Sequence, residues 1–211
     1  EDTKSSADCI RIVAISDTHN MHNRHAAFTT ALSKLYRSPN DILIHAGDFS
    51  ESGSKNEILA IDQWFAQLPF QHIFIISGNM DGISLDGDSV DGHVQFKHAV
   101  YLQHEAYTLK FEQLNGFQLT LFGSPYTPEF VGGFQISNDK MAQKLWSEIP
   151  ANTDIVVVHG PAKGILDRTS SGWSVGDAVL REEILQRVRP KAMIFGHVHA
   201  SHGSQVVQEK G

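Results

Sequence analysis

Five short apolar segments constrain the fold of this chain more than any other feature of its sequence. Each is rich in apolar, largely β-branched side chains and has a length suited to a buried strand. Apolar residues at helical spacing separate the first three, and the resulting order β-α-β-α-β is typical of a parallel sheet with helices on its faces. The five predicted strands are residues 10–15, 41–45, 72–76, 154–158 and 192–195.

Each predicted strand ends beside residues that bind divalent cations. The carboxyl ends of parallel strands share one edge of a sheet, so these distant residues are expected to meet there. Their donor atoms are oxygen and imidazole nitrogen without thiolate, a set that Mn, Fe, Co, Ni and Zn all accept. Seven ligands suit two divalent metal ions that share a bridging carboxylate. The predicted metal ligands are Asp17, His19, Asp48, Asn79, His159, His197 and His199.

Such a pair of ions has a defined chemistry. Two cations roughly 3.5–4 Å apart clamp a phosphoryl group and lower the pKa of a bound water, whose hydroxide attacks phosphorus directly. Glycine precedes Asp48, Asn79 and His197, as expected where the backbone bends sharply close to a ligand. The pattern therefore predicts a hydrolase whose partner is a small-molecule phosphate ester, with nucleotides among the candidates.

Charge and composition narrow the remaining classes. The formal charge of −7 disfavours a surface that binds nucleic acid or an anionic membrane. The single cysteine, Cys9, forms no internal disulfide, and no apolar stretch is long enough to span a bilayer. A cytoplasmic location is the default expectation unless a leader preceded Glu1. The oligomeric state stays open.

The rest of the chain is expected to form one domain. Residues 1–8 are polar and are expected to be disordered or foreign to the protein, which leaves a single domain over residues 9–211. Helical periodicity predicts helices over residues 26–36, 58–68, 137–149 and 177–188. Asn115-Gly116 predicts a hairpin between residues 107–111 and 117–122. Residues 82–92 are expected to form an irregular loop, and residues 123–128 to break regular structure.

Taken in order, these motifs resemble the calcineurin-like metallophosphoesterase superfamily. The matching motifs are Asp17-x-His19, Gly47-Asp48, Gly78-Asn79-x-Asp81, His159 and Gly196-His197-x-His199. Residues 123–130 and 159–161 are further similar to the small metallophosphoesterase-domain-containing group that includes brain protein 239. The resemblance implies an α/β fold, a four-layer α/β-β/α sandwich of mixed sheets, with a dinuclear site at its apex.

The resemblance also implies how the ligands divide between the ions. One ion would be held by Asp17, His19, Asp48 and His199, and the other by Asp48, Asn79, His159 and His197. Asp48 would then be the bridge, and Asn79 would also touch the substrate phosphate.

Three departures from the superfamily pattern affect the expected activity. Met80 replaces a histidine that often protonates the leaving oxygen, and a thioether cannot donate a proton. His22 is the best alternative donor; otherwise the enzyme favours good leaving groups. The Asp-Arg-Gly continuation of Ser/Thr protein phosphatases is missing after Asp48, so a phosphoprotein substrate is disfavoured. The superfamily sheet normally continues after the last motif, so the chain is expected to be truncated after Gly211.

Met80 removes the proton donor, and the small metallophosphoesterase-domain-containing group that the chain resembles is linked to phosphodiesterase activity. Both points favour a phosphodiesterase, with a phosphomonoesterase acting on a small molecule as the alternative. A scaffold that keeps the fold without the chemistry would be expected to have lost ligands, and here the set is complete. An amidohydrolase would place its His-x-His on the first strand and its aspartate on the last, the reverse of the order found. This chain is also short for eight βα units.

Overall fold

The computed structural model describes residues 9–23, 26–86 and 95–207. The strands are β1 (Ile12–Ile15), β2 (Ile42–Ala46), β3 (His72–Ile76), β4 (Val100–Tyr101), β5 (Glu105–Phe111), β6 (Phe117–Ser124), β7 (Thr127–Pro128), β8 (Gln135–Ile136), β9 (Ile155–Val158) and β10 (Ala192–Ile194). The helices are α1 (Ala26–Ser33), α2 (Lys55–Phe65), α3 (Gly82–Leu85), α4 (Asp139–Ser147) and α5 (Ala178–Glu182), which continues as the π-helix η4 (Glu183–Val188). Single 3₁₀ turns are η2 (Met21–Asn23), η3 (Glu112–Leu114) and η5 (His199–Ser201).

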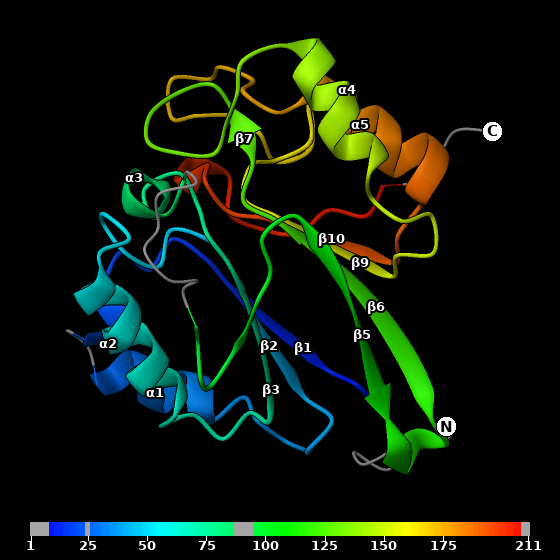
Figure 1. Cartoon of the computed structure of the whole chain (residues 1–211). Helices are drawn as coiled ribbons and strands as arrows, with labels where there is room; N and C mark the ends of the chain where they lie inside the picture. The colour runs from blue at the N-terminus through cyan, green and yellow to red at the C-terminus, as the bar shows by residue number, and fades with distance from the viewer. Residues whose placement is uncertain (1–8, 24–25, 87–94, 208–211) are drawn as a thin grey trace.

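Two four-stranded sheets form the centre of the molecule. The first has the order β1-β2-β3-β4, and all of its pairs are parallel. The second has the order β10-β9-β6-β5, in which β5 runs antiparallel to β6. Helices α1 and α2 cover the first sheet, and α4 and α5 cover the second (Figure 1). The predicted four-layer sandwich is therefore confirmed.

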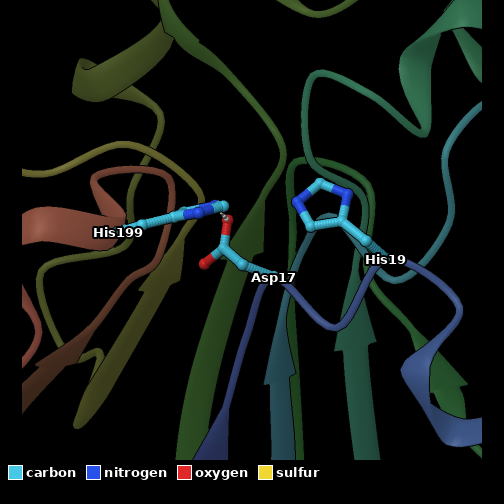
Figure 2. A group of neighbouring side chains, drawn as sticks. All are labelled: Asp17, His19 and His199. Carbon is cyan, nitrogen blue, oxygen red and sulfur yellow. Dashed lines mark ion pairs between the residues drawn. The ribbon is translucent and has the colours of Figure 1, made fainter.

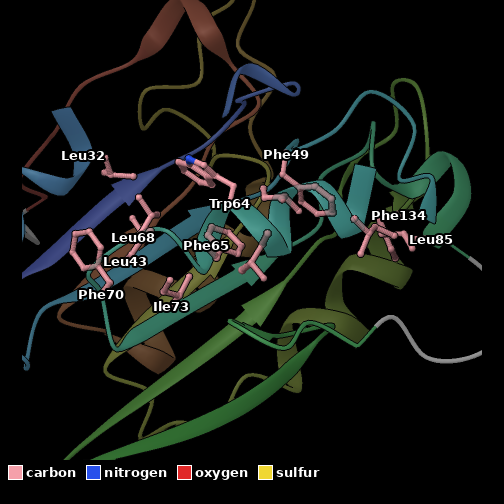
Figure 3. Close-up of a cluster of buried hydrophobic side chains, with 13 residues drawn as sticks. Leu32, Leu43, Phe49, Trp64, Phe65, Leu68, Phe70, Ile73, Leu85 and Phe134 are labelled. Atoms are coloured by element: carbon pink, nitrogen blue, oxygen red, sulfur yellow. The ribbon is translucent and has the colours of Figure 1, made fainter. Parts of the chain in front are cut away.

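Three clusters of buried apolar side chains hold these layers together. Trp64 and Phe65 of α2 pack with Leu43 and other residues of the first sheet (Figure 3). Between the sheets, strand residues alternate toward the partner sheet and form the second cluster, whose members include Ile42, Ile44, Phe74, Ile76, Leu119, Leu121, Ile155 and Val157. Under α4 and α5, fully buried Trp146 anchors the third cluster. Truncating such a side chain to alanine costs about 3–5 kcal/mol.

Local sequence signals explain where several elements begin. Asn138 caps α4, because its side chain accepts the backbone N–H of Met141 at 3.0 Å. The predicted hairpin is confirmed, with Asn115 and Gly116 at φ angles of 56° and 73° between β5 and β6. Parallel strands β1, β2 and β3 then direct their carboxyl ends to one edge, where the candidate site lies.

Several expectations for the connecting segments were wrong. Residues 82–85 form α3 rather than a loop, since the N–H groups of Gly82 and Asp86 bond back to the Gly78 and Gly82 carbonyls. Residues 87–94 lie outside the described part of the chain, as do residues 1–8. Residues 123 and 124 end β6 and pair with β9, and the two residues of β7 pair with β8, instead of being irregular. The helix expected over residues 177–188 is α-helical only to Glu182 and then widens into a π-helix.

Candidate metal centre

Backbone hydrogen bonds join the loops after β1 and β2 beyond the ends of their strands. The N–H of Asp17 donates to the carbonyl of Gly47 at 2.9 Å, and the N–H of His19 donates to the carbonyl of Asp48 at 3.0 Å. The two loops therefore leave the sheet in register. This pairing brings the first three predicted ligands to the same edge.

The seven predicted ligands form one cluster, and Asp48 lies at its middle and is 3% exposed. Its Oδ2 lies 3.8 Å from Nε2 of His19 and 3.5 Å from Nε2 of His159. Its Oδ1 accepts the N–H of Met80 at 2.9 Å. Burial opposes ionisation, but the bonds from His159 and Met80 outweigh it and hold the pKa of Asp48 below its usual range. One carboxylate oxygen thus faces histidines from two different loops, as a bridging ligand must.

His159 is completely buried, and its tautomer is fixed by its surroundings. Its Nδ1 lies 3.0 Å from the carbonyl of Ala46, which can only accept, so Nδ1 carries a proton. Its Nε2 then faces Oδ1 of Asn79 at 3.0 Å and the carboxylate of Asp48. Burial lowers the pKa of His159, but Asp48 outweighs this and raises it to about 9. Acceptors converging on Nε2 require positive charge there, which either a second proton or a cation supplies.

Asn79 and His197 complete this side of the cluster. Oδ1 of Asn79 lies 2.9 Å from Nδ1 of His197, and the rings of His159 and His197 are 5.0 Å apart. Burial, reinforced by His159, lowers the pKa of His197 to about 4. Separations of about 3 Å are those of neighbouring ligands that each lie about 2.1 Å from one cation.

The other side of the cluster is more open. Asp17 Oδ1 lies 3.3 Å from Nε2 of His199, and the rings of His19 and His199 are 5.5 Å apart. Figure 2 shows these three side chains directed toward one another from the loop after β1 and from η5. The backbone N–H of His197 also donates to both Asp17 oxygens at 3.1 Å. The Asp17 carboxylate is therefore held in place by the backbone of the loop that carries His197.

Two sets of donor atoms have the spacing of a metal site. The first is Asp17, His19 and His199, and the second is Asp17, Asp48 and His159. The first set contains three of the four ligands that the resemblance gives to one ion. The second overlaps the other ion's ligands at Asp48 and His159 but adds Asp17. All seven predicted ligands are thus brought together, whereas their division between two ions stays a prediction.

The backbone at the site is strained. Asp17, His19, Asp48 and His197 all adopt the left-handed conformation, with φ between 39° and 69°. That conformation costs a non-glycine residue of order 1 kcal/mol and persists where the surroundings impose it, often at functional sites. Four of the seven predicted ligands carry this cost.

Two glycines allow the loops to approach one another. A Cβ on Gly78 would lie 2.2 Å from Oδ1 of Asp48 and 2.6 Å from Cε1 of His159. A Cβ on Gly196 would lie 2.4 Å from Oδ2 of Asp17. The predicted need for glycine beside a ligand is therefore confirmed at these positions, since the space of a side chain is taken by a ligand from another loop.

Asp81 connects two loops of the site, a role that the sequence did not reveal. It is fully buried and accepts the N–H and hydroxyl of Ser50 and the N–H groups of Phe49 and Gly78, at 2.5–3.3 Å. Burial and the charge of Asp48 raise the pKa of Asp81 to about 7. Asp48 bonds to the loop after β3, and Asp81 bonds back to the loop after β2. This exchange fixes the two loops relative to each other.

His22 and His45 lie behind the ligands. His22 is 5% exposed and packs on Trp64 with ring centroids 5.4 Å apart, and neither of its ring nitrogens has a hydrogen-bond partner among the residues that the structure describes. Burial, opposed by Glu57, lowers the pKa of His22 to about 4, so the ring is neutral at pH 7. Nε2 of His45 bonds to the hydroxyl of Thr18 at 2.9 Å. This bond links β2 to the loop that carries Asp17 and His19. The role of His22 as a proton donor stays a prediction.

Fold and site together define an α/β sandwich protein with a candidate metal centre of carboxylate, amide and imidazole groups. The calcineurin-like phosphoesterase family model matches residues 10–201. The chain therefore belongs to the calcineurin-like phosphoesterase family, which confirms the resemblance. This membership supports a metal-dependent hydrolase activity on phosphoric esters.

Individual relatives agree with the family assignment. The chain is 28% identical over 218 residues to metallophosphoesterase domain-containing protein 1 of Homo sapiens, covering 92% of this chain and 61% of that protein. It is 34% identical over 212 residues to the probable rhamnogalacturonate lyase C of Emericella nidulans, covering 97% of this chain and 18% of that protein. The chain thus spans less than two thirds of the length of either relative.

Solved structures show the same fold at low identity. One superimposes with a TM-score of 0.58 and 16% identity, over 93% of this chain and 86% of the other. Phosphopantetheinyl hydrolase of Mycobacterium tuberculosis superimposes with a TM-score of 0.52 and 17% identity, over 92% of this chain and 84% of its own. Within the described residues of this chain, no helix has both the length and the apolar character needed to cross a bilayer.

Proposed function

We propose that this chain is a phosphodiesterase that depends on two divalent cations. The observation that carries the proposal is the arrangement around His159. A carbonyl fixes its Nδ1 as a donor, and its Nε2 points at the Asn79 amide oxygen and the Asp48 carboxylate. A ligand histidine that donates its other nitrogen to a backbone carbonyl is the usual arrangement at metal sites.

The carboxylate, amide and imidazole groups of the site fit such a pair of ions. Asp17, His19, Asp48 and His199 would hold one, and Asp48, Asn79, His159 and His197 the other. When bound, two cations would polarise a phosphoryl oxygen and supply ionised water at neutral pH. Manganese is one candidate among several, because the donor set itself does not select a metal.

The chain's own groups then have separate tasks. Asp48 holds both halves of the centre, since its oxygens face His19 and His159 on one side and Met80 on the other. Asn79 is held at its Oδ1 by the two histidines, and we assign its amide group to the substrate phosphate.

The preference for diesters rests on Met80. A thioether provides no proton to the leaving oxygen, so a substrate whose leaving group needs little protonation is favoured. We retain His22 as the candidate donor in this proposal. Its ring is neutral at pH 7, so it would have to bind a second proton before donating one, because a neutral imidazole does not give up its only N–H proton. The His22→Phe variant, which keeps an aromatic ring against Trp64, tests this role. Loss of activity toward poor leaving groups alone would support this role.

A substrate screen tests the proposal as a whole. Metal-stripped protein is assayed with bis(4-nitrophenyl) phosphate and 4-nitrophenyl phosphate after addition of Mn²⁺, Co²⁺, Ni²⁺ or Zn²⁺. The proposal predicts turnover that depends on metal and is faster for the diester. Faster turnover of the monoester would instead identify a phosphomonoesterase, and no turnover with any metal would favour a scaffold.

A further inference from the structure

An aromatic side chain stands exposed beside the candidate metal centre. Phe130, in the connection between β7 and β8, is 78% exposed, and its neighbour Val131 is 50% exposed. The ring of Phe130 lies 6.2 Å from the ring of His197, at an interplanar angle of 80°. An apolar surface therefore borders one of the predicted metal ligands.

Hydrogen bonds hold this connection rigidly. Gln135 accepts the N–H of Phe130 on its Oε1 and donates from Nε2 to the carbonyls of Val131 and Gly133, at 3.1 and 2.7 Å. The N–H of Gly133 donates to the backbone carbonyl of Asn79 at 2.9 Å. The segment that presents Phe130 is thus bonded directly to a predicted metal ligand.

This combination of rigidity and exposure is informative. A phenylalanine left in water gains none of the roughly 1.5–3 kcal/mol that burial would give it. Hydrogen bonds to the backbone of the connection also lower part of the entropy cost of a later contact. The arrangement is therefore suited to stacking against an aromatic group that arrives with a ligand, in the edge or offset geometries that such rings prefer.

We propose that Phe130 is a specificity-determining residue that contacts the organic group of the substrate and favours aryl over small alkyl phosphate esters. The inference rests on the proposed function, because it places the phosphoryl group of the ester at the cluster that contains His197 and Asn79. The contact adds to binding at the metal centre and is separable from it.

Calorimetric titration of the Mn²⁺-loaded protein with phenyl phosphate, methyl phosphate and inorganic phosphate tests this inference. Wild-type protein is expected to bind phenyl phosphate about three- to tenfold more tightly than methyl phosphate, as one aromatic contact allows. Phe130→Ala is expected to remove that preference while its affinity for inorganic phosphate stays within twofold of wild type. Phe117→Ala is the matched control, because Phe117 is a half-exposed phenylalanine at the first residue of β6, the end of that strand that lies away from the candidate metal centre.

The two proposals fail in different ways. A Phe130→Ala variant that keeps the wild-type preference for phenyl phosphate would overturn the role of Phe130 and leave the phosphoesterase assignment intact. Equal affinity of wild-type protein for the phenyl and methyl esters would do the same. Wild-type protein that bound none of the three ligands would also overturn the role of Phe130. The proposed function itself would fail only if this protein also showed no metal-dependent turnover of bis(4-nitrophenyl) phosphate.

Discussion

Replacing Gly78 by alanine would insert a methyl group between two predicted metal ligands. The new Cβ would lie 2.2 Å from Oδ1 of Asp48, 2.5 Å from the Asp48 backbone nitrogen and 2.6 Å from Cε1 of His159. Ordinary contacts begin near 3.4 Å, so the loops after β2 and β3 must separate by about 1 Å. Overpacking of this kind costs about 1–3 kcal/mol of folding free energy.

The effect on metal binding should be larger than the effect on stability. Metal–ligand distances vary by only about 0.2 Å among metal sites. Disturbing the groups that orient the ligands typically lowers metal affinity about 10–100-fold. Because Asp48 faces both halves of the cluster, we expect Gly78→Ala to weaken binding of both ions by about 100-fold. Titration calorimetry with Mn²⁺ and urea unfolding measure the two effects separately.

Gly172→Ala is the control for this prediction. Gly172 has a φ of 85°, and a Cβ there would meet no atom of the described residues within 4 Å. The substitution should therefore cost about 1 kcal/mol through backbone strain and leave metal affinity unchanged. A Gly78→Ala protein that binds Mn²⁺ as tightly as wild type would refute the packing argument.

Three further predictions follow from the loops and helices. Asp81→Ala leaves four buried donors without an acceptor and should lower the free energy of unfolding by at least about 2 kcal/mol. Ser50→Ala should lower it by about 1 kcal/mol. Equal losses for the two variants in urea titrations would contradict the role of Asp81 in fixing the loops after β2 and β3. Asn138→Ala should cost about 1 kcal/mol through loss of the α4 cap, and an unchanged unfolding midpoint would argue against that cap. The pKa of His22 is lowered to about 4 in the folded chain, so the unfolded state binds more protons between pH 6.5 and 4 and stability falls as the pH drops through that range. His22→Phe should reduce the slope of the free energy of unfolding against pH in that range by up to about 1.4 kcal/mol per pH unit. An identical slope in both proteins would contradict the lowered pKa of His22.

The positions of the seven predicted ligands could be read from the sequence because each follows a strand that is visible on its own. Asp48 and His159 are far apart in the chain, but parallel strands bring their carboxyl ends together whatever lies between them. Only the existence of the strands had to be inferred. Their β-branched composition was sufficient for that.

Features that depend on packing could not be read in the same way. Asp81 belongs to a recognised motif, yet its role depends on the N–H groups of Phe49 and Ser50, which only the folded loops bring near. His45 lies within a predicted strand, and only the folded structure shows that its Nε2 bonds to the hydroxyl of Thr18. Phe130 resembles an ordinary loop phenylalanine until its exposure and its distance from His197 are known.

The most direct test of the account is the metal content of wild-type and Asp48→Asn proteins, measured by elemental analysis after dialysis against Mn²⁺ or Zn²⁺. Each wild-type chain is expected to hold two divalent ions. Asp48→Asn is expected to lose tight binding of both, together with turnover of bis(4-nitrophenyl) phosphate. A wild-type chain that binds no ion, or an Asp48→Asn chain that retains two ions and near-normal turnover, would contradict the account.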